Sequence, residues 1–151
     1  MTRSWRARMI TASRLGLHDW LVVAESLVLL AWVELAIRVG APSRVLSWAT
    51  TPHRVNGTEP SEAEIRRLTW LHGMAANYHP MGPRCLTRSL SLARLLSRAG
   101  VVTQLKVGVN QHQGRLTAHA WVERNGRVLN DDVLVHQEFA VFGDPLDSST
   151  A

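Results

Sequence analysis

The sequence predicts an α+β fold, with helices in the first part of the chain and a small antiparallel sheet in the last part. Up to Gly100, apolar residues recur at helical spacing, and beyond it the period shortens toward two, as in strands. Asn125-Gly126 lies between two of the expected strands and is a strong β-hairpin signal. We therefore expect a cysteine-bearing helix that packs on a small antiparallel sheet.

We expect a single domain over residues 1–151, because a chain of this length supports one core. Residues 1–80 form its helical N-terminal part, 81–142 carry the cysteine helix and the sheet, and 143–151 form a flexible polar tail. The one cysteine, Cys85, cannot form an internal disulfide. This composition favours a reducing, cytoplasmic setting.

The longest expected helix runs from Leu17 to Val39 and ends at Gly40. It is broadly apolar, but Glu25 and Glu34 lie about half a turn apart around its axis, so no single side hides both. We therefore expect neither a membrane span nor a cleaved signal peptide. The helix packs within the domain, or it also docks a partner through apolar residues that remain exposed.

Further helices are expected before the sheet begins. A short helical piece covers 44–48 and a loop covers 51–60. Ser61 and Glu64 form a capping box that begins a helix through Ala75, and 78–83 breaks it. The next helix begins at Cys85 and ends before Gly100.

The expected strands cover 101–109, 116–123 and 127–131, and residues 133–142 are a candidate for one more.

The chain carries 17 basic and 12 acidic residues, a net charge of +5. The strongest local excess is at the start, where four arginines (Arg3, Arg6, Arg8 and Arg14) precede any acidic residue. A basic chain is compatible with nucleic acid, a membrane surface or an acidic peptide, and charge alone does not choose among them. We expect no nucleic-acid partner.

Cys85, His119 and Asp131 occur in an order that suits thiol catalysis. A helix N-terminus stabilises negative charge and so favours the Cys85 thiolate, with Arg84 and Arg88 beside it. A histidine can then protonate the leaving amine while a carboxylate orients its ring. Taken alone, a free cysteine is more often a core residue, and a strand histidine or a turn aspartate is more often structural.

An oxyanion would be held by the backbone N–H of Cys85 or Leu86, which the first helical turn leaves unpaired. Asn77 and His79 are two candidate side-chain donors.

The register of the expected hairpin decides which carboxylate meets His119. A three-residue loop, 124–126, with Gly126 left-handed in a bulge, sets His119 opposite Asp131 and puts Leu129 on the face of Trp121. A two-residue Asn125-Gly126 loop would set His119 opposite Asp132. The Arg-Asn-Gly order favours the bulged loop, and we expect Trp121 and Leu129 to shield the pair from water.

Metal binding is not expected, because one cysteine and seven scattered histidines show no ligand spacing. We expect no cofactor.

Several segments together resemble one known family. They are Arg84-Cys85-Leu86-Thr87-Arg88-Ser89-Leu90, Val107-Gly108-Val109, Ala118-His119-Ala120-Trp121-Val122-Glu123, Asn125-Gly126 and Leu129-Asn130-Asp131. Over about the last 70 residues, the chain resembles the leader peptidases of lasso peptide biosynthesis, which are transglutaminase-like cysteine proteases with a papain-like core. The helical first half is similar in character rather than in motif.

The resemblance implies a hydrolase that removes the leader from a ribosomally made lasso precursor peptide. It implies Cys85, His119 and Asp131 as the catalytic triad. The length of 151 residues resembles the split form of these enzymes, which works with a separate, winged-helix-like leader-recognition protein. An ATP-dependent lasso cyclase would then use the amine that cleavage frees.

Two alternatives stay open. The same triad supports acyl transfer with an amine in place of water, as in transglutaminases. The second alternative is a non-catalytic peptide-binding module with Cys85 in its core.

Overall fold

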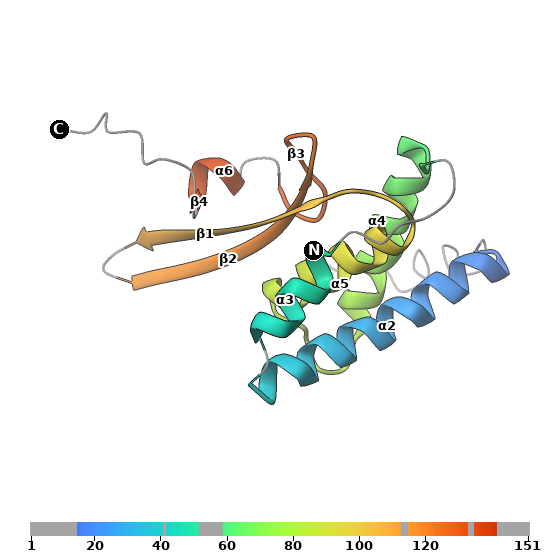
Figure 1. Ribbon diagram of the computed structural model, residues 1–151, viewed down its shortest axis with the longest axis horizontal. Coiled ribbons are helices and arrows are strands. Elements are labelled where there is room, and N and C mark those ends of the chain that lie inside the picture. Colours follow the sequence, from blue (N-terminus) through green and yellow to red (C-terminus); the bar gives the residue numbers. More distant parts are fainter. Residues whose placement is uncertain (1–14, 41, 52–58, 113–114, 133–134, 142–151) are drawn as a thin grey trace, which may run out of the picture.

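The computed structural model describes residues 15–40, 42–51, 59–112, 115–132 and 135–141, with the large helices grouped beside an antiparallel sheet (Figure 1). The helices are α2 (Leu17–Arg38), α3 (Pro42–Thr50), α4 (Glu62–Tyr78), α5 (Cys85–Arg98) and α6 (Val135–Glu138). The strands are β1 (Gln104–His112), β2 (Arg115–Arg124), β3 (Arg127–Val128) and β4 (Ala140–Val141), in the sheet order β3-β2-β1-β4. The α+β class is confirmed.

Besides the ends of the strand expected over 133–142, three other predictions fall wholly or partly outside the described residues. They concern the basic start, most of the loop expected over 51–60, and the tail expected over 143–151.

Helix α5 is the element around which the core is built, since it packs against α2, α3, α4 and both long strands. Leu90, Leu92 and Leu96 on α5 are fully buried. Leu90 packs with residues of α2 and α3, and Leu92 and Leu96 pack with residues of α4 and β2. The leucine spacing that predicted this helix therefore reflects contacts on several sides.

Buried polar side chains fix α5 to its neighbours as well. Thr87, Ser89 and Ser91 are all buried, and each is hydrogen-bonded to a different element. The pairs are Thr87 with the Glu34 carboxylate of α2 (2.5 Å), Ser89 with the Ala120 carbonyl of β2 (2.8 Å), and Ser91 with His72 of α4 (2.9 Å). Because buried polar groups are costly to leave unpaired, these bonds limit how α5 can rotate or slide.

Helix α2 matches the expected helix to within one residue, and its inner face contributes Leu30 and Val33 to the core. Trp32 contacts Trp48 of α3 with ring centroids 4.5 Å apart. Among the described residues, α2 is the one helix long and apolar enough to cross a membrane, a criterion that core helices and signal sequences also meet.

The predicted hairpin register is wrong. Asn125 and Gly126 both have positive φ (52° and 75°), as in a two-residue type I′ loop, and Arg124 pairs with Arg127. Val128 therefore joins the cluster around Trp121, and Leu129 packs instead with the cluster that contains Val122. The physical reason is that two left-handed residues in succession match the twist of the flanking strands without a bulge.

The last expected strand is mostly replaced by other structure. The described part of 133–142 contains α6 and then the short β4, which pairs with β1 at Gly108 and Val109. Phe139, between α6 and β4, packs with Trp121 on the sheet. The strand expected over 127–131 keeps only Arg127 and Val128.

Gly108 lies where the sheet, Trp121 and the α6–β4 segment meet. A Cβ atom there would lie 2.9 Å from both Phe139 Cβ and the Trp121 ring, and 3.1 Å from the carbonyl oxygen of Ala140. We predict that Gly108→Ala lowers the free energy of unfolding by about 1–3 kcal/mol, because backbone and packed rings must move apart. Denaturant unfolding measures this change.

Gly73→Ala in α4 is the matched control, since a Cβ there meets nothing within 4 Å and the backbone is helical. It should stabilise by about 0.4–1 kcal/mol. Equal effects of the two substitutions would contradict the packing described at Gly108.

Candidate active site

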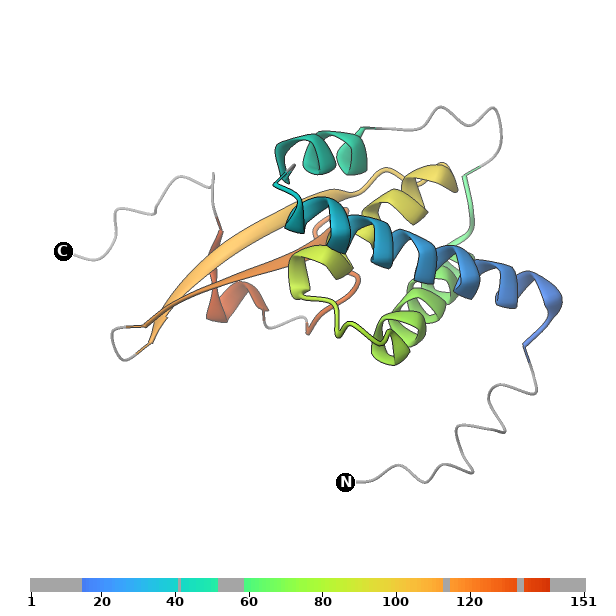
Figure 2. The ribbon, with the colours of Figure 1, turned by 90° about the horizontal axis from the view of Figure 1, so that it is seen from below.

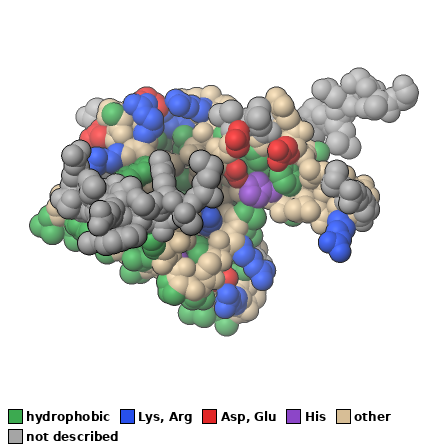
Figure 3. Space-filling view, turned by 180° about the vertical axis from the view of Figure 1, so that it is seen from behind, with side chains coloured by type: hydrophobic (Ala, Val, Ile, Leu, Met, Phe, Trp, Pro, Cys, Tyr) green, Lys and Arg blue, Asp and Glu red, His purple; other side chains and the backbone are tan. Residues whose placement is uncertain are grey.

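Cys85, His119 and Asp131 line one cleft of about 780 Å³, although the sequence separates them by as many as 46 positions (131 − 85). Its walls come from α4, the start of α5, strand β2 and the chain that follows β3. Figure 3 shows the molecule from behind, with a histidine beside acidic side chains on that face. The structure thus brings the three predicted site residues to one cavity.

Cys85 is the first residue of α5 and is partly buried. The side chain of Arg84, the N-cap residue, makes no capping hydrogen bond. The first helical bond runs from Arg88 N–H to the Arg84 carbonyl (2.9 Å). The N–H groups of Cys85 and Leu86 are therefore outside the helical ladder, at the positive end of the helix dipole.

His119 and Asp131 are joined by a hydrogen bond between His119 Nε2 and Asp131 Oδ2. The side chains are 26% and 31% exposed, so water reaches the pair but does not surround it. Because Asp131 engages Nε2, the nitrogen that stays free to exchange a proton is Nδ1. In a neutral ring with the proton on Nε2, Nδ1 is an acceptor.

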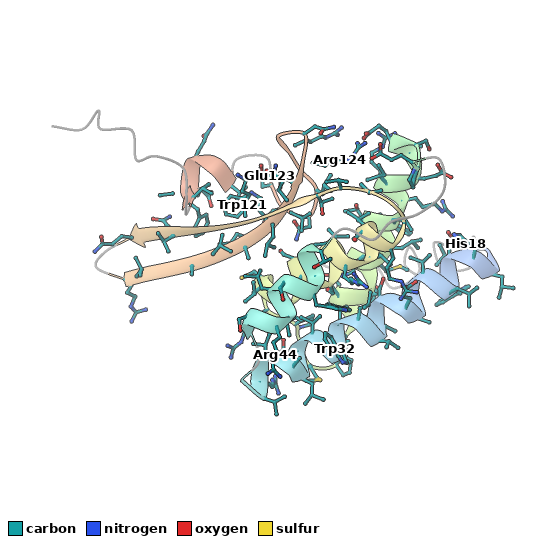
Figure 4. The ribbon with its side chains drawn as sticks, in the orientation of Figure 1. His18, Trp32, Arg44, Trp121, Glu123 and Arg124 are labelled. Atoms are coloured by element: carbon teal, nitrogen blue, oxygen red, sulfur yellow. The ribbon has the colours of Figure 1, made fainter. Side chains whose placement is uncertain are left out.

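Aromatic rings cover the base from the α6 side of the sheet. The His119 ring centroid lies 6.2 Å from that of Trp121 and 5.1 Å from that of Phe139. Figure 4 shows Trp121 beneath α6. Shielding was expected from Trp121 and Leu129, and the structure assigns the second role to Phe139.

Asp131 reaches His119 because the chain leaves the sheet just before it. Val122 N–H donates to the side-chain oxygen Oδ1 of Asn130 (2.8 Å), while Leu129 N–H still donates to the Val122 carbonyl (2.9 Å). Asn130 Nδ2 also donates to Ser89 Oγ (2.9 Å). The Asn130 side chain thus takes the place of the backbone acceptor that Val122 N–H would find on a paired strand. The two-residue register therefore does not determine the position of Asp131.

Ser89 and Asn130 are site residues that the sequence reasoning did not single out. Both lie within the segments that carry the resemblance, and Ser89 follows Cys85 by one helical turn. That spacing places Ser89 on the same side of the helix as Cys85, and it was the one sequence signal for its role. It does not identify the residues that Ser89 contacts, Ala120 and Asn130.

Of the two candidate oxyanion donors, Asn77 lies in the cleft lining and His79 does not. Asn77 Oδ1 accepts a hydrogen bond from Arg88 (2.5 Å), which fixes the amide and leaves its Nδ2 donors for another acceptor. His79 is buried, and its Nδ1 accepts from Met81 N–H (3.3 Å). Geometry favours Asn77.

In the described part of the chain, no group of three or more histidine, cysteine, aspartate or glutamate residues is arranged to hold a metal ion.

His72 lies in the wall of the cleft and is buried against α5. Burial, and secondarily the positive charge of Arg88, lowers the pKa of His72 from 6.5 to about 4. Ser91 Oγ donates its proton to the Thr87 carbonyl (2.7 Å), so the His72 ring donates to Ser91 through Nε2–H. The ring is therefore neutral, with its proton on Nε2.

The shifted pKa of His72 predicts how stability depends on pH. Between about pH 6.5 and pH 4, the unfolded chain binds a proton at His72 and the folded protein does not, so the free energy of unfolding falls as the pH falls. The full loss is on the order of 3 kcal/mol. Urea unfolding at a series of pH values measures it.

His72→Gln keeps a donor near Ser91 but cannot titrate, so its stability should depend less on pH over this interval. Glu34 has a pKa below its usual value, chiefly because of the Thr87 hydrogen bond, and loses stability in the same direction in both proteins. Identical slopes for wild type and variant would contradict a neutral, buried His72.

The family comparison agrees with this geometry. The model of the transglutaminase-like superfamily matches residues 26–143, which include the three cleft residues Cys85, His119 and Asp131. No curated protein and no solved structure matches the chain significantly. Since the family match covers most of the sequence, the chain belongs to the transglutaminase-like superfamily.

Proposed function

We propose that this protein is a cysteine peptidase in which Cys85 is the nucleophile, His119 the acid and base, and Asp131 the group that orients His119. The observation that carries the proposal is the His119–Asp131 pair in the same cleft as a cysteine at a helix N-terminus. Membership in the transglutaminase-like superfamily supports cysteine-dependent peptidase or acyltransferase chemistry.

In the proposed reaction, the Cys85 thiol gives its proton to His119 Nδ1, and the resulting thiolate attacks the carbonyl carbon of the scissile peptide bond. The oxyanion accepts hydrogen bonds from the N–H groups that begin α5, with Asn77 Nδ2 as the side-chain donor. The His119 imidazolium gives its proton through Nδ1 to the leaving amine, and a thioester to Cys85 forms. His119 then removes a proton from water, which hydrolyses the thioester and restores the thiol.

We further propose that the substrate is a lasso peptide precursor and that the cut releases its leader in the cytoplasm. This follows from the resemblance of the segments around Cys85, His119 and Asp131 to lasso leader peptidases. A separate leader-recognition protein would present the precursor, and an ATP-dependent cyclase would use the freed amine. The cleft wall beyond the triad includes Trp70, Arg66 and Arg127, which suits an extended peptide with apolar and acidic side chains.

Acyl transfer is the second candidate, favoured by the transglutaminase-like family itself. The two reactions share the thioester and differ in the group that attacks it. Mass spectrometry of the products separates them: hydrolysis gives the leader as a free acid, and transfer gives the leader joined to an added amine.

We predict that Cys85→Ala abolishes leader release by the purified protein with its leader-recognition partner, because no other group supplies the nucleophile. EDTA should leave wild-type cleavage unchanged. Release that survives Cys85→Ala, or that EDTA alone stops, rejects the proposal. Iodoacetamide at about pH 6 should alkylate Cys85 in the native protein, whereas a core thiol of a binding module would stay unmodified.

We predict that Asp131→Asn lowers the rate of leader cleavage at least about tenfold, because an amide neither fixes the His119 tautomer nor stabilises the imidazolium. Asp132→Asn is the matched control and should lose little, since its backbone N–H still donates to Asp131 Oδ1 (2.8 Å). Comparing cleavage rates of the two variants tests the assignment. Equal losses would indicate a shared role, and the reverse ranking would assign the carboxylate to Asp132.

A further inference from the structure

Helix α2 presents a second apolar face to solvent, opposite the face that joins the core. Leu21, Val28 and Leu35 are 60%, 68% and 60% exposed. Leu17, Trp20 and Trp32 are exposed beside them. Figure 2, seen from below, shows α2 (blue) crossing in front of the other helices. We call these six residues the outer face of α2.

This face is unusual because both sides of α2 are apolar. A helix at the surface of a soluble domain normally has one apolar stripe and one polar face. Exposed apolar patches of this kind mark contact with another apolar surface. The face runs along a helix of 22 residues, about 33 Å in length.

The acidic residues of α2 do not lie on the outer face as free charges. Asp19 and Glu34 are buried. Asp19 is paired with Arg67 of α4 (2.5 Å), and Glu34 is hydrogen-bonded to Thr87 of α5 and paired with Arg38 (3.0 Å). The third, Glu25, is paired with Arg98 of α5 (2.9 Å). Each carboxylate is therefore neutralised by a partner within the protein.

Basic residues flank α2 on both sides in the sequence. The 14 residues before Leu15 carry four arginines and no acidic residue. After the helix, Arg44 is exposed at the start of α3, and Arg38, although paired with Glu34, keeps a side chain that is 58% exposed. Figure 4 shows Arg44 and Trp32 at this end of the molecule. An apolar face with tryptophans, flanked by cations, is complementary to an anionic lipid surface.

We infer that the outer face of α2 docks the protein onto the surface of an anionic membrane, with the helix lying in the interface rather than crossing it. Asp19 and Glu34 stay buried in the protein in this arrangement, and Glu25 stays paired with Arg98. This inference is independent of the proposed peptidase activity, because the lipid probe contains no peptide.

The test is co-sedimentation of the full chain with vesicles of phosphatidylcholine alone and of phosphatidylcholine with phosphatidylglycerol. We expect binding to the anionic vesicles that weakens as salt is added. The variant L21Q/V28Q/L35Q should bind at least about tenfold more weakly. The matched control is V102Q/L116Q, which replaces two side chains outside α2 that are 70% and 71% exposed and should bind like wild type.

Thermal unfolding of each variant shows whether it remains folded, as expected for substitutions at exposed positions. Absence of binding to anionic vesicles would overturn the inference, as would equal binding to both lipid compositions or equal losses in the two variants. Size-exclusion chromatography with light scattering tests whether a second copy of the chain occupies the face instead. A wild-type dimer that does not bind vesicles, and that L21Q/V28Q/L35Q converts to a monomer, would assign the face to a second copy.

Discussion

The hydrogen bond from Val122 N–H to Asn130 Oδ1 is the constraint on which the proposed site depends. Continued pairing in the register of Arg124 with Arg127 would set His119 opposite Asp132. Asn130 instead replaces the backbone acceptor, so the chain turns away and Asp131 reaches His119 Nε2. The same side chain donates to Ser89 of α5, so one residue links the base, the carboxylate and the helix that begins at Cys85.

The position of α5 is fixed in a comparable way. Its apolar side is held by close packing with the neighbouring elements. Thr87, Ser89 and Ser91 add directional bonds to α2, β2 and α4, all within two turns of Cys85. Helix α2 therefore helps to position the site, because Glu34 accepts a hydrogen bond from Thr87 in the first turn of α5. The opposite face of α2 stays exposed.

Much of the fold was predictable because it follows from local patterns. Periodicity gave α2 and α5, the Ser61–Glu64 capping box marked the start of α4, and Asn125-Gly126 marked the hairpin. The order of Cys85, His119 and Asp131 suggested a shared site, which the cleft is consistent with. The predicted register was wrong because Asn125-Gly126 forms the two-residue type I′ loop, which needs no bulge. Asp131 nevertheless meets His119, because the strand pairing breaks where Asn130 contacts two other elements. Such long-range side-chain bonds leave no periodic signal in a single sequence.

We propose that Cys85 attacks the peptide and carries the leader as a thioester. The most direct measurement is mass spectrometry of the wild-type protein after incubation with precursor and leader-recognition protein, rapid acid quenching and digestion. We predict a leader-derived acyl group on the fragment that contains Cys85, and its absence in a Cys85→Ala sample treated in parallel. Cleavage of the precursor with no adduct on Cys85, or with the acyl group on another residue, would contradict it.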